Sequence, residues 1–256
     1  DNQGLWMGCL DKSPVGCIAG VRYNLEYGFI GLFIVEESQR GNGYGVELWK
    51  RALDHLSNVK CVGLEAAPNR VKDYETWGFK QSSLTTRWKL FIQENKFSDL
   101  SSDTTKYESL DIIEGCSIPR KIVHIYDAKR ETSPRPHFLS DWLNHPSGKV
   151  LALIDSTRVC HGFGRIRPCL LKEGEGWRIG PLIADDQYLA EILLRRLISR
   201  HPGTVLIDSP GLNPLADNLF TKLGFRDVSK TIRMYKGSQP PLAMSEVYGL
   251  ACLELG

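Results

Sequence analysis

FIGLFIVEESQRGNGYG, residues 29–45, is the stretch of sequence that decides the fold. It begins with a continuous apolar run from Phe29 to Val35, which is typical of a strand buried on both faces. After the glycines the apolar residues recur with a helical period and form one stripe. The residues of that stripe are Leu48, Trp49, Ala52, Leu53 and Leu56. The pattern therefore predicts a glycine-rich loop between a buried strand and an amphipathic helix.

Such a loop has the chemistry of a pyrophosphate site. A helix N-terminus offers unpaired amides and the positive end of its dipole, and glycines allow positive φ and a close approach of the backbone. Glycines alone are a weak signal, because dinucleotide folds and phosphate loops also use them, as do turns that bind nothing. No Lys-Ser or Lys-Thr follows Gly45, which argues against a nucleotide-triphosphatase loop. No acidic residue ends the following strand where a ribose would need one.

The remaining pattern runs twice along the chain in the order hairpin, strand, helix, strand, helix, strand. In the first half the expected elements are 5–10, 15–23, 29–35, the helix after Gly45, 60–66, a helix at about 70–77 and a strand at 79–92. In the second half they are 149–155, 159–167, 177–183, the helix around 189–198, 204–208, the helix 214–223 and 229–235. Gly78-Phe79 and Gly224-Phe225 close the two copies, so a repeat of about 145 residues is expected.

We therefore expect an α/β protein with two tandem copies of one domain, each built on a mixed sheet. The expected boundaries are 1–92 for the first domain, 93–106 for a polar linker, 107–237 for the second domain and 238–256 for a strand-like tail. We also expect the two domains to pack together, since each alone would expose much apolar surface.

Composition excludes several classes of protein. The net charge of +2 is too near neutral for a nucleic-acid or polybasic membrane surface, and no apolar run approaches 18 residues. The seven cysteines are odd in number and lack a C-x-x-C pair, which favours a reduced, cytoplasmic protein. We expect no metal, no nucleic acid and no membrane among its partners.

The loop and the second helix of the first half carry a family resemblance. Residues 35–48, VEESQRGNGYGVEL, closely resemble the acetyl-CoA loop of the GNAT superfamily of N-acetyltransferases, whose signature is Q/R-x-x-G-x-G/A after a strand. Tyr74-Glu75-Thr76-Trp77-Gly78-Phe79 resembles that family's Y-x-x-x-G-F. The resemblance covers roughly residues 5–90. The second half is similar to a subgroup with a second GNAT-like domain fused behind the first. The strand and two helices that usually precede the first hairpin of a GNAT domain are expected to be lacking from the first copy, and the tail at Val247–Leu255 is a candidate to fill their place.

The resemblance implies roles for residues of the first half. Backbone groups of Phe33, Ile34 and Val35 would pair with the pantetheine arm of acetyl-CoA as an added strand would. The amides of the loop would bind its pyrophosphate; these residues are Arg40, Gly41, Asn42, Gly43, Tyr44 and Gly45. An amine on a small molecule or peptide would attack the thioester carbonyl directly. Tyr74 would then protonate the leaving thiolate.

The general base is not fixed by the sequence. Glu26, Glu65 and a chain of water molecules are open candidates, the alternative for each carboxylate being an ordinary surface role. Asn69 is the candidate for the family's asparagine contact with the cofactor, although it lies five residues before Tyr74 where the family has seven. Tyr74 itself could instead be an ordinary packed tyrosine.

The second half departs from the family pattern. Asp185-Asp186 stand where an anion should bind, and Phe220 stands where Tyr74 does, so we expect the fold without the chemistry. Arg165, Arg167 and Arg178 could recognise an acidic group, with surface ion pairs as the other interpretation.

The sequence thus predicts an acetyl-CoA-dependent N-acetyltransferase that uses acetyl-CoA as co-substrate. The alternatives are a non-catalytic acyl-CoA-binding or regulatory module and, third, a nucleotide-binding fold.

Overall fold

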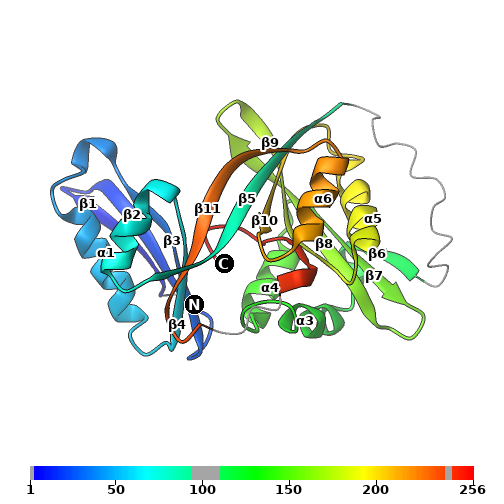
Figure 1. The fold of residues 1–256 in the computed structure, drawn as a ribbon, viewed down its shortest axis with the longest axis horizontal. Coiled ribbons are helices and arrows are strands. Elements are labelled where there is room, and N and C mark those ends of the chain that lie inside the picture. The colour runs from blue at the N-terminus through cyan, green and yellow to red at the C-terminus, as the bar shows by residue number, and fades with distance from the viewer. Residues whose placement is uncertain (1–2, 94–109, 240–243) are drawn as a thin grey trace. The chain divides into compact units, whose positions relative to one another are not determined.

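A computed structural model describes residues 3–93, 110–239 and 244–256. These residues form two compact units (Figure 1). Unit 1 consists of Asp1–Ser83, Thr231–Pro241 and Cys252–Gly256, and unit 2 consists of Leu84–Lys230 and Leu242–Ala251. The expected linker, 93–106, lies outside the described residues apart from Gln93.

Unit 1 is a mixed sheet with helices packed on one face. Its strands are β1 (Leu5–Leu10), β2 (Ser13–Arg22), β3 (Tyr27–Val35) and β4 (Cys61–Ala66), joined by the end of β11 (Arg226–Gly237). All neighbours are antiparallel except β3 and β4, which are parallel. Helix α1 (Tyr44–His55) connects that parallel pair, and α2 (Val71–Thr76) follows η2 (Pro68–Arg70). The apolar stripe of α1 packs with Ile18, Ile30 and Leu64 of the sheet, which places the glycine loop at the end of β3.

Unit 2 repeats this plan. Its strand order is β6 (Leu110–Glu114), β7 (Lys149–Asp155), β8 (Cys160–Leu171), β9 (Gly174–Ala184), β10 (Gly203–Pro210) and β5 (Lys80–Ile92), with β9 and β10 parallel. Helices α5 (Gln187–Ile198) and α6 (Pro214–Lys222) cover the face that carries Ile166, Ile179 and Ile207 (Figure 1). Helices α3 (Arg120–Ala128) and α4 (Pro136–Asn144) contact Phe163 and Arg165 of β8. Because side chains alternate along a strand, these two residues lie on the sheet face opposite the one that α5 covers.

The last strand of each half of the sequence completes the sheet of the other unit. Residues 85–92 of β5 pair with β10 in unit 2, and residues 232–237 of β11 pair with β4 in unit 1. The units therefore differ from the sequence ranges 1–92 and 107–237. Both strands have a periodicity that fits either unit, so local sequence patterns do not reveal the exchange.

Two segments differ from the sequence expectation. Residues 110–144 hold β6, η4 (Gly115–Ser117), α3 and α4, for which the sequence analysis assigned no elements. The tail is a strand only over β12 (Val247–Gly249), which follows η5 (Met244–Glu246) and pairs with β9 in unit 2. Residues 252–256 continue without strand structure and lie against β3 in unit 1, where the Gly256 and Phe29 atoms meet and the Tyr23 hydroxyl donates to the Leu255 carbonyl. The tail thus covers part of the sheet face of unit 1 that bears Phe29.

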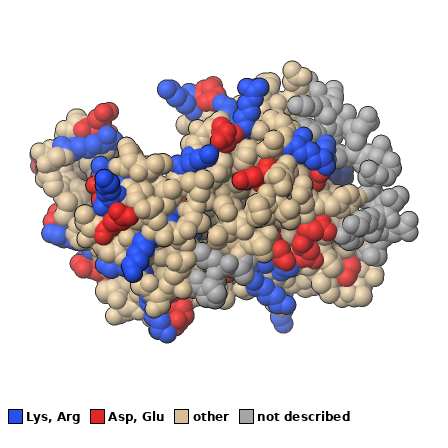
Figure 2. Space-filling model, viewed as in Figure 1, with Lys and Arg blue, Asp and Glu red and all other residues tan. Residues whose placement is uncertain are grey.

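Charged side chains are mixed on the surface. On the face drawn in Figure 2, Lys and Arg are interspersed with Asp and Glu. The exposed pair Lys60–Glu26 and the pair of exposed Lys222 with partly buried Glu191, both at 2.8 Å, hold opposite charges together. None of the helices in the described part of the chain is long and apolar enough to cross a membrane.

Candidate functional site

The end of β3 separates from β4 and leaves one edge of the strand open. Pairing between the two strands ends at Ile30 and Leu64, although β3 runs on to Val35 alongside β2. Leu32 has a φ of 51°, and the register with β2 shifts between Cys17 and Ala19. This bulge bends the strand away from its parallel neighbour. An extended ligand can therefore add to β3 at the residues that follow Ile30, as a further strand would.

The loop that follows β3 has the backbone of an anion site. Gly41 and Gly43 have φ values of 85° and 86°, and no atom lies within 4 Å of the position that a Cβ would take at either residue. Gly43 is the N-cap of α1 and has no side chain to accept from the first amides of the helix. These amides and the positive end of the helix dipole are thus available to a phosphate group.

Other residues of the loop fix its position against β3. The Arg40 guanidinium donates from Nε to the Val35 carbonyl at 3.1 Å, and the Asn42 amide donates to the Gln39 carbonyl at 3.2 Å. A Cβ on Gly45 would lie 3.3 Å from Val35 Cγ2, so a glycine lets α1 approach the strand. The structure therefore brings Phe33–Val35 and Arg40–Gly45 together at one end of unit 1; their contacts with a cofactor remain a prediction.

Tyr74 packs close to these residues through Trp49. The Trp49 ring lies 5.5 Å from the Phe33 ring and 5.2 Å from the Tyr74 ring, measured between centroids. Burial raises the pKa of Tyr74 more than nearby Arg70 lowers it, so the phenol stays protonated through neutral pH. Trp49 was assigned by the sequence only to the apolar stripe of α1. Its Nε1 is buried without a hydrogen-bond partner, which makes it a donor beside Tyr74 that the sequence analysis missed.

Glu65 is engaged in a buried ion pair. Its carboxylate accepts from Arg233 Nε at 2.6 Å and from the Thr231 hydroxyl at 2.6 Å, and both charged side chains are only 4% exposed. Although burial lowers the pKa of Arg233, the Glu65 carboxylate holds it above the usual value. A carboxylate with both oxygens occupied and a cation alongside is a poor acceptor for a substrate proton. The geometry therefore argues against Glu65 as the general base and for a structural role.

Glu26, the other candidate for the general base, and Asn69, the candidate for a cofactor contact, both lie at the surface. Glu26 forms an exposed ion pair with Lys60, which is the ordinary surface role. Asn69 is exposed in η2, between the end of β4 and α2. Neither residue shares a described contact with Tyr74.

In unit 2, a segment of the chain covers the strand edge that is open in unit 1. The pairing of β9 with β10 ends at Ile179 and Ile207, as that of β3 with β4 ends at Ile30 and Leu64. Beyond Ile179, β12 pairs with Leu182 and Ile183, which match Phe33 and Ile34 in their register with the preceding hairpin strand. The Leu250 amide also donates to the Asp208 carbonyl of β10 at 2.8 Å. Residues 247–250 thus bridge the two strands where unit 1 could receive a pantetheine arm.

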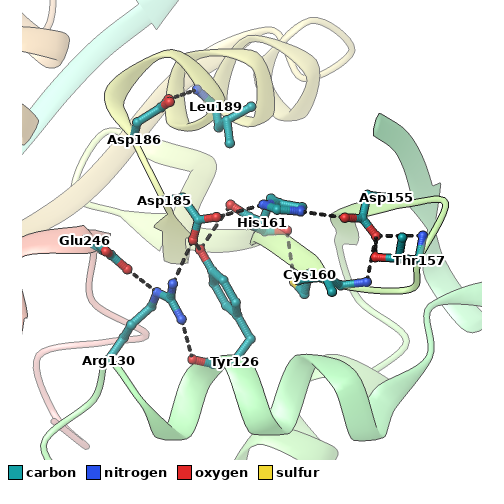
Figure 3. A network of polar contacts seen from close by, with 12 residues as sticks. Tyr126, Arg130, Asp155, Thr157, Cys160, His161, Asp185, Asp186, Leu189 and Glu246 are labelled. Carbon is teal, nitrogen blue, oxygen red and sulfur yellow. Dashed lines mark hydrogen bonds and ion pairs between the residues drawn. The ribbon is translucent and has the colours of Figure 1, made fainter. Parts of the chain in front are cut away.

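A network of polar contacts surrounds Asp185, which directly follows β9 (Figure 3). Its carboxylate accepts from the Tyr126 hydroxyl and from Arg130, both at 2.7 Å, and faces His161 Nδ1 at 2.8 Å. The other ring nitrogen of His161 faces Asp155 at 3.1 Å. Burial lowers the pKa of His161, but the two carboxylates outweigh it and raise the pKa above 6.5. Both carboxylate oxygens of Asp185 thus have a partner from the protein itself.

Residues next to this network cap the N-terminus of α5 and bind the segment before β12. The Asp186 side chain accepts from the Leu189 amide at 2.9 Å and caps α5, so a carboxylate of the chain takes the place that a phosphate could take. Arg130 also pairs with Glu246, which directly precedes β12 (Figure 3). Phe220 is fully buried at the position that matches Tyr74 and offers no hydroxyl. The unit keeps the fold while its own groups occupy the corresponding site.

Comparison with known proteins agrees with this description. An acetyltransferase (GNAT) family model matches residues 1–79, and an acetyltransferase (GNAT) domain model matches residues 123–249. The chain is 30% identical over 258 residues to holothin acyltransferase of Pseudoalteromonas sp. (strain SANK 73390), covering 100% of this chain and 82% of that protein.

Two solved structures share the fold. A Pyrococcus horikoshii protein classed as an acetyltransferase is 22% identical with a TM-score of 0.79, covering 100% of this chain and 81% of that one. A tandem GNAT protein from the clavulanic acid biosynthesis pathway is 11% identical with a TM-score of 0.63, covering 93% and 83%. The two matched domains, the repeated fold and the acyltransferase relative lead to one conclusion: this chain belongs to the GNAT superfamily of acyltransferases and carries two GNAT-like domains in tandem.

Proposed function

We propose that unit 1 transfers an acetyl group from acetyl-CoA to an amine. The observation that carries this proposal is the open, uncapped N-terminus of α1, with Gly41 and Gly43 in free space next to an unpaired edge of β3. Together these features fit a ligand with a pyrophosphate at one end and an extended amide-bearing arm at the other. Unit 2 lacks both features, so one acyl-CoA site per chain is proposed.

In the proposed reaction the amine attacks the thioester carbonyl as the free base. A new C–N bond forms, the C–S bond breaks, and the CoA thiolate leaves. Tyr74 gives the thiolate a proton, and the nitrogen loses its extra proton to water, because Glu65 is held in an ion pair. Amides at the start of α1 and on β3 orient the donor and polarise its carbonyl.

The acceptor is proposed to be an amine on a small molecule or peptide. The relative named holothin acyltransferase supports including holothin in a panel of acceptors, together with donors longer than acetyl-CoA. The test is continuous detection of free thiol while acetyl-CoA is mixed with each amine and the acylated product is identified by mass spectrometry. Steady thiol release that requires an amine is expected.

The alternative is a module that binds acyl-CoA without turnover. Tyr74 favours the enzyme, because a phenol kept protonated beside the proposed thioester position suits a proton donor. Calorimetric titration with CoA, NAD and ATP separates the two proposals from a nucleotide-binding fold. Binding of CoA without thiol release across the panel would favour the module, and preference for NAD or ATP would reject both.

A further inference from the structure

One face of the sheet in unit 1 carries an exposed apolar surface. Apolar residues of α1 and α2 both join the core around Ile18 and Leu64, so these two helices pack on the same face. Side chains of β1, β2 and β3 that alternate with that core point to the opposite face. Because residues directly across antiparallel strands share a face, two rows form there. The first row is Leu5, Ala19 and Gly31, and the second row is Met7, Cys17 and Ile34.

The second row is exposed and uncharged. Met7 is 67% exposed and Ile34 is 56% exposed. The three strands, which the structure describes in full, contain a single charged residue, Arg22. Arg22 is opposite Gly28, whose Cβ position faces Leu56 of α1, so Arg22 belongs to the helix face. The opposite face of these strands therefore attracts apolar groups and offers a ligand no charged side chain of β1, β2 or β3.

The tail segment, residues 252–256, borders this surface. A Cβ on Gly31 would lie 1.9 Å from the Glu254 carbonyl oxygen, so only a glycine lets the segment approach the strand. The Tyr23 hydroxyl donates to a carbonyl of the segment and holds it there. Gly31 is the first residue of β3 beyond Ile30, where the pairing with β4 ends. The segment thus forms a wall at the start of the open strand edge.

The proposed reaction determines the face from which the amine approaches. A pantetheine arm paired with β3 lies in the plane of the sheet, and so does the carbonyl of a thioester at its end. A nucleophile attacks a carbonyl carbon from above or below the carbonyl plane. Helices α1 and α2, with Trp49 and Tyr74, occupy the space on one side. The amine therefore approaches from the other side, past the tail segment and the row of Met7 and Ile34.

We infer that the acceptor of unit 1 is an apolar amine, which lies on the row of Met7 and Ile34 with the tail segment as its wall. This inference rests on the proposed function and names the substrate class that the proposed function leaves open. Contact with the row stabilises an alkyl or aromatic group, whereas a charged group would lose water there without gaining a partner on these strands. Met7 and Gly31 are then specificity-determining residues, because Met7 contacts the acceptor and Gly31 keeps the wall in place.

The test measures thiol release by the full chain with acetyl-CoA and four primary amines. Phenylethylamine and hexylamine are the apolar probes, ethanolamine is the polar probe and putrescine is the charged probe. Rates are compared per concentration of free base, because only the neutral amine reacts. We expect kcat/KM to be roughly tenfold or more higher for the two apolar amines than for the other two.

Met7→Asp tests the row. It puts a charge at an exposed position, so the fold should survive. It should raise the KM for the apolar amines at least fivefold while the KM for acetyl-CoA stays as in the parent. Leu25→Asp is the matched control, because Leu25 is 63% exposed in the segment between β2 and β3 and belongs to neither row. This control should behave as the parent does.

Gly31→Ala tests the wall. The added Cβ should push the tail segment off β3 and raise the KM for the apolar amines at least fivefold. Gly28→Ala is the control on the same strand, since its Cβ meets Leu56 and Val21 on the helix face, and it should keep the KM of the parent. Calorimetric titration of phenylethylamine into the chain saturated with CoA repeats each comparison without turnover. Met7→Asp still decides the inference if Gly31→Ala fails to fold.

The outcomes separate this inference from the function on which it rests. If CoA does not bind, or binds and no amine releases thiol, the proposed function fails and the inference fails with it. If thiol is released but the four amines are used equally, or Met7→Asp keeps the KM of the parent, only the inference is overturned. A parent that is a dimer on a sizing column, with a monomeric Met7→Asp variant of unchanged amine KM, would also overturn it and assign the row to contact between copies.

Discussion

The strands and helices that units 1 and 2 share match as far as the last paired residues of the parallel strands, and they differ beyond them. Each has a buried acid one residue after that point, Glu65 in one and Asp208 in the other. Each acid is paired with an arginine of the strand that comes from the other half, Arg233 or Arg87. This pair secures the exchanged strand in both units, so it belongs to the fold.

Among the matched elements, the differences lie at the places where a ligand could bind. In unit 1 the strand edge is open and α1 starts at a glycine, whereas in unit 2 β12 covers the edge and Asp186 caps α5. A site can therefore be lost when the chain supplies its own substitutes for the ligand, here a strand for the arm and a carboxylate for the phosphate. The comparison also separates residues kept for folding from residues kept for binding.

The largest expected effect comes from making unit 1 resemble unit 2 at Tyr74. Tyr74→Phe keeps the ring against Trp49 and removes the hydroxyl that the proposed mechanism needs when the thiolate leaves. Single-turnover acetyl transfer should fall by roughly 10²–10⁴-fold with CoA affinity nearly unchanged. The reverse change, Phe220→Tyr, should create no activity and should destabilise the protein by about 1–3 kcal/mol, because it buries a hydroxyl. A Tyr74→Phe variant as fast as the parent would make Tyr74 a packing residue.

The matched acids give the next largest effect. Glu65→Gln and Asp208→Asn each remove a charge from a buried ion pair and should each lower the free energy of unfolding by about 3–5 kcal/mol. Denaturant unfolding of both variants measures this. Similar losses are expected because the pairs have the same place in the two sheets. If Glu65→Gln instead keeps its stability and loses only acyl transfer, Glu65 is the base after all.

A pair of glycines tests the anion site. Gly43→Val puts a side chain into the space kept for the phosphate and should weaken CoA binding roughly 100-fold, since about two charge-assisted hydrogen bonds are lost. Gly203 is the control in unit 2, because it also has a positive φ, 103°, and free space around its Cβ position. Both variants should lose a similar amount of stability, and Gly203→Val should bind CoA as the parent does. Equal CoA affinity in the two variants would move the cofactor away from the loop.

Local patterns predicted much of this molecule. The change from an apolar run to a helical stripe at Gly45 located the loop, and Gly78-Phe79 and Gly224-Phe225 located the repeat. The sequence contains one further repeat. Thr85-Thr86-Arg87 and Thr231-Ile232-Arg233 stand in the same register to those glycines, Arg87 nine residues after Gly78 and Arg233 nine after Gly224. This repeat contains the two arginines that form the buried ion pairs. The pair of Arg233 with Glu65 argues against Glu65 as the general base.

The exchange of strands and the covering of unit 2 could not be predicted in this way. Both depend on pairing between residues distant in sequence, and β5 and β11 have the same pattern whichever sheet they join. β12 has three residues, too few for a periodic signal. The burial of Arg165 could not be predicted either, because an arginine in a strand is expected to be exposed unless its contacts are known.

The smallest expected effect concerns the His161 network of unit 2. The two carboxylates on its ring nitrogens raise the pKa of His161 in the folded protein above its unfolded value of 6.5. The stabilisation is therefore fully present below pH 6.5 and is lost as the pH rises through the raised pKa. Unit 1 has no histidine held between two carboxylates in its described residues, so this loss is specific to unit 2.

The measurement is the thermal midpoint from pH 6 to pH 9. His161→Gln keeps hydrogen-bonding capacity without the titrating charge, so it should be less stable than the parent at pH 6 and should approach it at pH 9. His137→Gln, at an exposed position of α4, should follow the parent throughout. Because Asp185 also holds Arg130 and Arg130 holds Glu246, the same pH range should loosen the segment before β12, which amide hydrogen exchange of residues 246–249 can follow. A parent midpoint with the same pH profile as His161→Gln would show that the folded protein does not favour the charged ring.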